Sequence, residues 1–194
     1  MAEAESLFEV YIEEIIKWNS RVNLVSRNDI PFLKERHLQD SLAAASKISG
    51  KSIVADIGSG NGFPVIPLSI AKPDCQFHAF ESREKRTIFL DHVCRKCGIK
   101  NLKVHNVRVE KEMGEFSKFA DIVISRAFKE NVQFVESALS LLKKEGQVIT
   151  FNTLLNNEIE EIEKKHKVKV KNVDNYVYNL DNGQKRTLSS FIIS

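Results

Sequence analysis

The residues whose types and spacing indicate chemistry form a glycine-rich loop after a predicted strand. The segment 56–64 reads Asp-Ile-Gly-Ser-Gly-Asn-Gly-Phe-Pro; it follows the β-rich run 52–57 and leads into a predicted helix that contains Pro67. Glycines let the backbone turn tightly and approach a ligand without a Cβ clash. The dinucleotide fingerprint G-x-G-x-x-G requires glycine at position 63, which is Phe63 here. The three glycines, Gly58, Gly60 and Gly62, therefore predict a nucleoside-type cofactor other than a dinucleotide.

Two acidic residues complete this pattern. Asp56 precedes the first glycine by two residues, and D-x-G-x-G-x-G is typical of Rossmann-like methyltransferases that use S-adenosylmethionine. We expect Asp56 to meet the positively charged amino-acid end of that cofactor, directly or through water. Glu81 ends the second predicted strand, where a carboxylate can accept hydrogen bonds from both ribose hydroxyls. The alternative is a turn-forming glycine cluster with an unrelated surface glutamate.

The segment after the fourth predicted strand, Ser125-Arg126-Ala127-Phe128, bears on the methyl acceptor. It lacks the Asp/Asn-Pro-Pro-aromatic tetrapeptide of enzymes that methylate exocyclic amines. Methylation of cytosine C5 needs a cysteine nucleophile, and none of the three cysteines lies at the end of a late predicted strand. Both absences favour an acceptor that already holds a lone pair, such as guanine N7, for which alignment suffices without a general base. We expect Arg126 to contact the guanine or the cofactor and Phe128 to stack on a base. A buried ion pair and a core phenylalanine are the alternatives.

Five ordered motifs spread over nearly the whole chain resemble the bacterial small-subunit ribosomal RNA guanine-N7 methyltransferase family, RsmG or glucose-inhibited division protein B. The motifs are Trp18-Asn19 with Asn23-Leu24, residues 36–41, residues 56–67, Glu81-Ser82 with Lys85-Arg86, and residues 125–128. The resemblance implies methyl transfer from S-adenosylmethionine to N7 of a guanine in 16S ribosomal RNA, with S-adenosylhomocysteine as product. Two positions depart from the family: Val25 replaces the usual threonine, and Glu81 stands where many members have Asp.

The resemblance also implies site residues. Its expected cofactor contacts are Gly58, Phe63, Glu81, Val109, Glu110 and Arg126, to which the loop and strand-end patterns add Asp56, Gly60, Gly62 and Ser82. The candidates for positioning the substrate are Arg126, Phe128, Arg36, His37 and Asp40, with a guanine or a phosphate as the group bound. For Arg36, His37, Asp40 and Ser41 the alternative is an ordinary helix-surface network, because i,i+3 and i,i+4 spacings place such side chains together. No residue is assigned as a general base.

The elements that must position these residues alternate between strand and helix. An amphipathic helix is predicted over about 6–19, and a second begins after Asn28 or Asp29, with Pro31 in its first turn, and ends at Gly50. Predicted strands cover 52–57, 75–80, 102–105, 119–124, 147–151, 168–178 and 186–193, with helices over 86–97 and 130–143. We expect an α/β, Rossmann-like class I S-adenosylmethionine-dependent methyltransferase fold: a mostly parallel seven-stranded sheet with an antiparallel C-terminal pair. Residues 1–50 form an N-terminal helical extension, and 51–194 the methyltransferase domain, as one structural unit.

Composition limits the remaining choices. The chain has 194 residues, 42% hydrophobic and 28% charged, with a net charge of +3, which is ordinary globular usage. The charge is uneven, because residues 51–110 carry ten basic and six acidic side chains; a phosphate-rich partner and solvated helix faces both explain this. There is no apolar run of about 18 residues and no basic-then-apolar leader. We expect a cytoplasmic monomer that binds the small ribosomal subunit and no membrane.

Two further patterns are interpreted as structural. Cys94 and Cys97 form a C-x-x-C near a predicted helix C-terminus, where the helix dipole disfavours a thiolate, and only His92 and His105 lie near enough to add zinc ligands. We therefore expect no metal and no redox role. The basic run 164–171 is expected to be an exposed strand face. Two other functions stay open: methylation of a small metabolite, and non-catalytic nucleotide sensing on the same fold.

Overall fold

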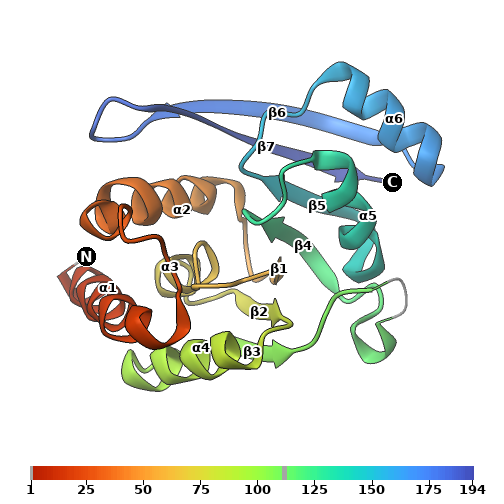
Figure 1. Cartoon of the computed structure of the whole chain (residues 1–194). Helices are drawn as coiled ribbons and strands as arrows, with labels where there is room; N and C mark the ends of the chain where they lie inside the picture. The colour runs from red at the N-terminus through yellow and green to blue at the C-terminus, as the bar shows by residue number, and fades with distance from the viewer. Residues whose placement is uncertain (1, 111–112) are drawn as a thin grey trace.

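Seven strands form one mixed sheet in the computed structural model, which describes residues 2–110 and 113–194. The order is β3-β2-β1-β4-β5-β7-β6 (Figure 1). The strands are β1 Ile53–Ile57, β2 Gln76–Glu81, β3 Leu102–Asn106, β4 Ala120–Ser125, β5 Leu142–Thr150, β6 Val170–Asn179 and β7 Lys185–Ile193. The first five pair in parallel, whereas β7 is antiparallel to both β5 and β6. This confirms the predicted class I methyltransferase architecture.

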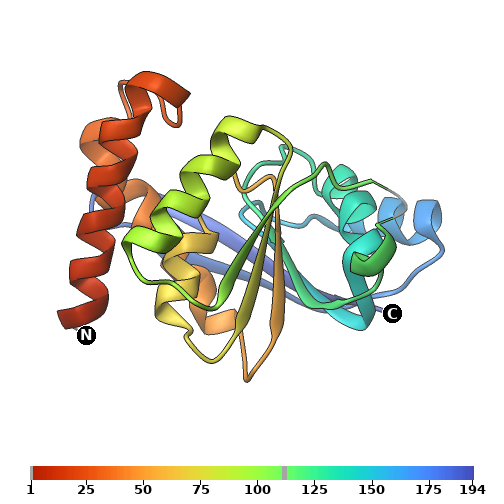
Figure 2. The same ribbon diagram turned by 90° about the horizontal axis from the view of Figure 1, so that it is seen from below.

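Helices cover both faces of the sheet, so its central strands are apolar on both sides. On one face α1 Ala2–Val22, α3 Val65–Ala71 and α4 Glu84–Lys96 pack over Val54, while on the other α5 Asn131–Leu141 packs over Ala55 (Figure 2). Val54 and Ala55 are adjacent in β1 and fully buried in different cores, as the two-residue repeat of a strand requires. Because β1 pairs in parallel with both β2 and β4, the carboxyl ends of these three strands meet at one edge of the sheet. The predicted glycine loop, Glu81 and Arg126 lie at this edge.

The predicted second N-terminal helix is wrong as a continuous element. The chain instead forms η1 Ile30–Phe32, a π-helix η2 Leu33–Leu38, a short α2 Gln39–Ala43 and η3 Ala44–Lys47. Leu33 and Leu38 are both buried although they are five residues apart. The i→i+5 turn of a π-helix brings residues with that spacing to one side, which a regular α-helix does not.

The expectation that the basic run is an exposed strand face holds only for Lys171, which lies in β6, and is wrong for the rest of the run. Lys164, Lys165 and His166 lie in the last turn of α6 Asn156–His166, and β6 begins only at Val170. Ile159 and Ile162, three residues apart, face the core beneath α6, and their spacing is the helical pattern of this segment.

The predicted antiparallel C-terminal strand pair is confirmed, with its turn at 181–183 and Gly183 at φ +78°. Within the described residues, no helix combines the length and the apolar character needed to cross a membrane.

Candidate cofactor and substrate site

The glycine loop leaves the end of β1 and is held against β2. The backbone N–H groups of Gly58 and Ser59 donate to the Phe80 carbonyl at 2.8 and 3.2 Å. Gly58 and Gly60 have φ values of +74° and +56°, a region in which L side chains are strained. The turn therefore requires glycine at both positions.

Gly62 has a different role, because it allows a helix to approach the loop. A Cβ atom at Gly62 would lie 2.7 Å from Ile66 Cγ1 and 2.9 Å from the Tyr11 hydroxyl oxygen. The Tyr11 hydroxyl donates to the Asn61 carbonyl at 2.8 Å, which ties α1 to the loop. Phe63 is buried beside Tyr11, its ring centroid 5.0 Å from the tyrosine ring and 5.5 Å from that of His37.

A cavity of about 270 Å³ opens where β1, β2 and β4 end; we call it the strand-end cavity. It brings together the predicted residues Gly58, Glu81, Ser82, Val109 and Phe128. Its other lining residues are Ile57, Phe80, Val107, Arg108, Ala127 and Ser137. Of the other predicted cofactor contacts, Asp56, Gly60, Gly62, Phe63, Glu110 and Arg126 do not line it. Val107 and Arg108 were not predicted as site residues, although their position directly after β3 could have indicated them.

Glu81 organises the mouth of this cavity. Its Oε2 accepts from the Gly60 N–H at 2.9 Å and its Oε1 from the Arg83 N–H at 2.8 Å. The Arg86 guanidinium lies 3.8 Å from Oε2. A carboxylate offers about four lone-pair positions, so Glu81 retains acceptor capacity for further hydroxyl donors.

Asp56 is a buried carboxylate with an unsatisfied oxygen. The residue is 1% exposed, and its Oδ2 has no hydrogen-bond partner within the described residues. Burial raises the pKa of Asp56 to about 7, although the Ser59 side chain and the positive charge of Arg126 oppose part of that rise. A cationic group would relieve the cost of burying this carboxylate without a partner.

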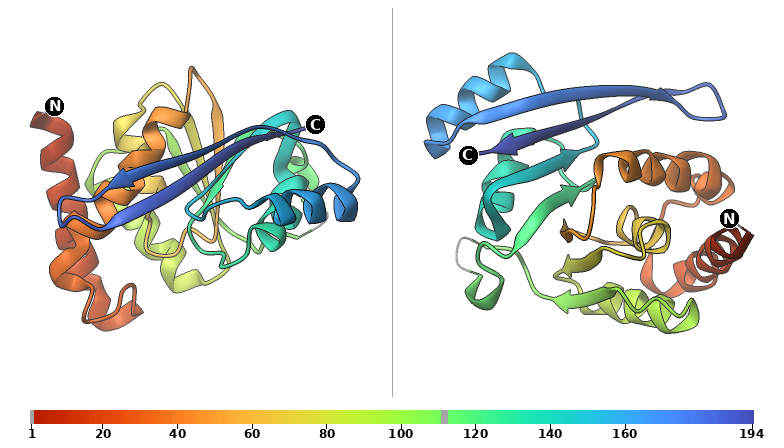
Figure 3. Two further views of the ribbon diagram at one scale, coloured as in Figure 1. Left: turned by 90° about the horizontal axis from the view of Figure 1, so that it is seen from above. Right: turned by 180° about the vertical axis from the view of Figure 1, so that it is seen from behind.

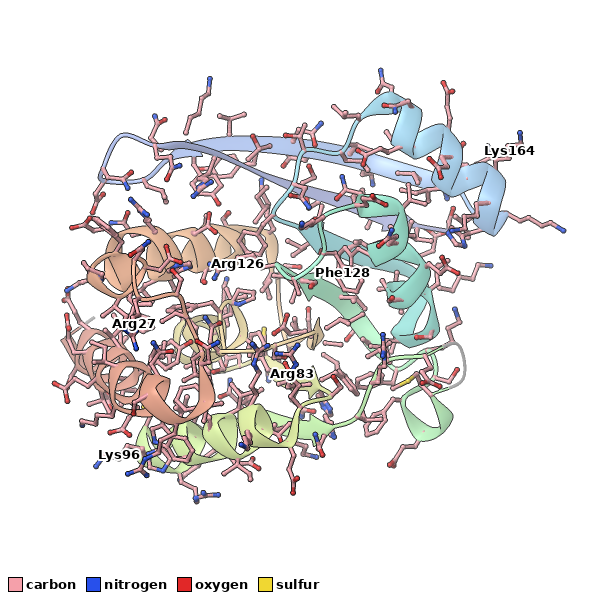
Figure 4. All side chains as sticks on the ribbon, in the orientation of Figure 1. Arg27, Arg83, Lys96, Arg126, Phe128 and Lys164 are labelled. Carbon is pink, nitrogen blue, oxygen red and sulfur yellow. The ribbon has the colours of Figure 1, made fainter. Side chains whose placement is uncertain are left out.

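A second cavity, of about 390 Å³, lies on the other side of the segment after β4; we call it the arginine cavity. It brings together Arg36, His37, Asp40 and Arg126, the last of which is labelled in Figure 4. Its remaining lining residues are Asp29, Phe151, Asn152, Gln184 and Arg186, none of which was predicted. Arg126 lines this cavity, whereas the next two residues, Ala127 and Phe128, line the strand-end cavity.

Arg126 is held by a network within the arginine cavity. Its Nη2 lies 2.8 Å from His37 Nδ1 and its Nη1 3.4 Å from Asp40 Oδ2, while the Tyr178 hydroxyl donates to Asp40 Oδ1 at 2.5 Å. An arginine only donates, so His37 Nδ1 accepts and the imidazole is neutral. Burial, together with the charge of Arg126, lowers the pKa of His37 to about 4, in agreement with that assignment. Burial and the Asp40 carboxylate raise the pKa of Tyr178.

The alternative of a helix-surface network among Arg36, His37 and Asp40 is not what the structure shows. Asp40 is buried and turned toward Arg126 and Tyr178. The guanidinium of Arg36 instead lies 3.8 Å from the Phe32 ring centroid and 3.7 Å from Asp29 Oδ1. Regular α-helical spacing does not apply across the π-turn that carries Arg36 and His37.

A sequence-family profile described as rRNA small subunit methyltransferase G matches residues 4–188. The chain belongs to this family. Two relatives carry that same name: one from Geobacter sp. strain M21 is 34% identical over 148 residues, covering 76% of this chain and 68% of the relative. The other, from Legionella pneumophila strain Lens, is 41% identical over 130 residues, covering 67% and 61%.

Solved structures agree with the fold of this rRNA small subunit methyltransferase G family member. A SAM-dependent O-methyltransferase from Thermotoga maritima superposes with a TM-score of 0.57 at 14% identity, covering 84% of this chain and 69% of that one. A SAM-dependent methyltransferase from Aquifex aeolicus has a TM-score of 0.57 at 14% identity, covering 87% and 98%. These likenesses concern the fold alone, and they confirm the predicted class I methyltransferase fold.

The N-terminal motif of this family member has a structural role here. Asn19 Oδ1 accepts from the N–H groups of Leu24 and Val25 at 2.7 and 2.9 Å, which closes the turn after α1. Trp18 packs against Phe89 of α4, with ring centroids 5.8 Å apart. The motif thus fixes α1 over the sheet face that carries the glycine loop.

The C-x-x-C pair sits in an environment that disfavours thiolates. Burial raises the pKa of Cys94 to about 12 and raises that of Cys97 as well. The two nearby histidines have other partners: His92 Nε2 lies 2.8 Å from Glu14 Oε2, and His105 Nε2 lies 3.0 Å from a nitrogen of His78. Across residues 2–110 and 113–194, no three His, Cys, Asp or Glu side chains gather as metal ligands would.

Proposed function

We propose that this protein transfers a methyl group from S-adenosylmethionine to N7 of a guanine in 16S ribosomal RNA of the small subunit. The observation that carries the proposal is the pair of cavities separated by residues 126–128, in a chain that belongs to the rRNA small subunit methyltransferase G family. The strand-end cavity is the proposed cofactor site. The arginine cavity is the proposed RNA side.

The residues around the strand-end cavity suit an adenosyl ligand with a cationic amino-acid end. Glu81 retains lone pairs for two ribose hydroxyls, and Val109 offers an apolar wall for an adenine ring. Asp56 has the unpaired buried oxygen that an ammonium group would satisfy. The bound cofactor supplies an electrophilic methyl group; the residues of the chain bind and orient it. We assign Gly58, Gly60 and Ser82 to the same site and propose that Gly62, Phe63 and Glu110 support it from outside the cavity.

The acceptor chemistry needs positioning more than proton transfer. Guanine N7 presents a lone pair in the plane of the base, so no base has to remove a proton before the methyl group moves. We propose that Arg126, held by His37 and Asp40, orients the RNA beside the cofactor, and that Phe128 contacts the base or the adenine edge. Residues 1–50 and 51–194 act as a helical extension and a methyltransferase domain of one unit.

The proposal is tested by incubating the protein with labelled S-adenosylmethionine and small ribosomal subunits from a strain that lacks the enzyme. We expect label in 16S ribosomal RNA and chemical cleavage at a single N7-methylguanine. Cofactor binding without label in the RNA would contradict the proposal. Label in a metabolite extract instead of subunits would indicate a small-molecule methyltransferase, and nucleotide binding without any turnover a sensing module.

A further inference from the structure

We propose that the arginine cavity binds a backbone phosphate of the substrate RNA and that Arg186, from the C-terminal hairpin, is one of its ligands together with Arg36. The inference rests on the proposed function in that the phosphate belongs to RNA. It extends that function to a strand pair that none of the five family motifs includes.

The hairpin reaches the cavity because it lies across the N-terminal helical segments (Figure 3). Arg186 pairs with Tyr178 in the β6–β7 register, and the Tyr178 hydroxyl donates to Asp40. At the hairpin tip, the Asp181 N–H donates to Gln39 Oε1 at 3.0 Å. These contacts bring Arg186 of β7 and Arg36 of η2 into the lining of one cavity.

The two arginines have hydrogen-bonding capacity that the protein leaves unused. Within the described residues the Arg36 guanidinium makes no hydrogen bond beyond its 3.7 Å ion pair with Asp29, and its Nε has no partner. Arg186 donates only to Gln184 Oε1, at 3.1 Å, and its Nε is also without a partner in that part of the chain. Because each guanidinium carries five N–H donors, the spare groups of this cavity are mostly donors.

The charge of the cavity selects an anion. Three arginines face two aspartates, and His37 is neutral, so the lining is positive by one charge. Asp40 is already engaged by Arg126 and Tyr178. Planar guanidinium groups with free donors suit a phosphodiester, which accepts hydrogen bonds and does not donate them.

The acceptor edge of the target guanine is a poorer match for these donors. Arginine commonly binds guanine through O6 and N7 together. In the proposed reaction the N7 lone pair must stay free for the methyl group, so a donor on N7 would block transfer. The arginines therefore position the RNA through its backbone, which sets register without reading sequence.

The test compares Arg36→Gln and Arg186→Gln with the matched control Lys185→Gln, which removes the same charge one residue away on the other face of the strand. The probe is the small subunit from a strain lacking the modification, titrated between 50 and 200 mM salt. We expect each arginine variant to weaken binding and raise KM about fivefold to tenfold, and to reduce the log–log salt slope by about 0.7 to 0.9. The kcat and the calorimetric affinity for S-adenosylmethionine should stay unchanged, and Lys185→Gln should stay within about twofold of wild type.

Other outcomes would contradict one proposal or the other. If the arginine variants bind subunits as tightly as the wild type, the phosphate site is wrong. If the wild-type protein also labels the RNA, the proposed function is still supported. An equal loss in Lys185→Gln would indicate diffuse surface charge and no cavity site. If the wild-type protein binds subunits but does not methylate their RNA, the proposed function is wrong. The binding of the arginine variants would still show whether the phosphate site exists. If wild type binds neither subunits nor naked 16S ribosomal RNA, both proposals fail. Circular dichroism excludes misfolding, and Arg186→Lys, which keeps the charge, should retain more binding than Arg186→Gln.

Discussion

At the scale of single residues, the unusual group is the Asp56 carboxyl, buried with an unpaired oxygen and a pKa raised by burial to about 7. Such a group gains most from a cation, because pairing offsets the desolvation that raised the pKa. The nearby positive charge of Arg126 opposes that rise but makes no hydrogen bond to Asp56 among the described residues. The affinity for a cofactor with a free ammonium group should therefore depend on pH.

We predict that S-adenosylmethionine binds most tightly between about pH 7 and 8. Below pH 7 Asp56 is protonated and neutral, so affinity should fall roughly fivefold to tenfold by pH 6. Above about pH 8 the α-amino group of the ligand loses its charge, and affinity should fall again. Calorimetry at pH 6, 7.5 and 9 measures both limbs. The Asp56→Asn variant should bind S-adenosylmethionine weakly at every pH and should not lose affinity between pH 7.5 and pH 6. If its affinity still falls at pH 6 as in the wild type, another group is responsible for that fall.

Arg126 is the residue whose loss should separate activity from folding. Arg126→Ala is expected to reduce kcat/KM by at least about 100-fold, because a misplaced substrate loses alignment with the methyl group. The fold should persist, since Asp40 keeps the Tyr178 hydroxyl. Initial rates and circular dichroism test the two statements. The pKa of His37 should also rise in this variant, because Arg126 helps to lower it. Wild-type rates would remove Arg126 from the site.

At the scale of elements, the packing of α1 on the glycine loop depends on Gly62. Gly62 has φ +95°, and a Cβ atom added to it would lie less than 3 Å from Ile66 and Tyr11. Gly98 has φ +64°, but a Cβ atom added to it would have no other atom within 4 Å. Gly62→Ala should lower the free energy of unfolding by about 2–4 kcal/mol, from overpacking added to backbone strain. The matched Gly98→Ala should cost about 1 kcal/mol, from strain alone. Urea unfolding measures both; equal losses would contradict a packing role for Gly62.

At the scale of the whole molecule, charge counted along the sequence does not locate the proposed RNA-binding face. Several basic residues of the segment 51–110 are distributed along α4, from its N-cap Arg83 near the strand ends to Lys96 at its far end (Figure 4). Arg86 is near Glu81, whereas Lys100 and Lys103 line a separate pocket with His78. The arginines that do gather, Arg36, Arg126 and Arg186, come from three distant segments.

The α6 lysines should contribute little to RNA binding for the same reason. Lys164 lies on α6, at one end of the C-terminal hairpin, whereas Arg126 of the arginine cavity lies nearer the centre of the molecule (Figure 4). We predict that Lys164→Gln with Lys167→Gln changes the affinity for small subunits less than about twofold at 100 mM salt, because distant exposed charges are screened. The same titration measures it; a tenfold loss would place RNA over α6.

Local patterns in the sequence by themselves determined much of this protein. Alternating strands and helices imply the sheet and its helical layers, and glycines at 58 and 60 mark a turn that only positive φ allows. Glu81 is predicted at the end of β2, where its carboxylate accepts from the Gly60 N–H. These features follow from constraints among residues that are neighbours in sequence or in the predicted sheet.

Tertiary structure alone decided how the arginine cavity is built. Arg126 meets Asp40 across 86 residues and Tyr178 meets Asp40 across 138, and no periodicity signals such pairs. The π-turn at 33–38 places Leu33 and Leu38 in one core, which the sequence pattern did not indicate. Gln184 and Arg186 entered the site because the hairpin folds across α2. Burial and charge act through space, so the partners of Asp40 and the raised pKa of Asp56 follow from the packed molecule and not from the order of its residues.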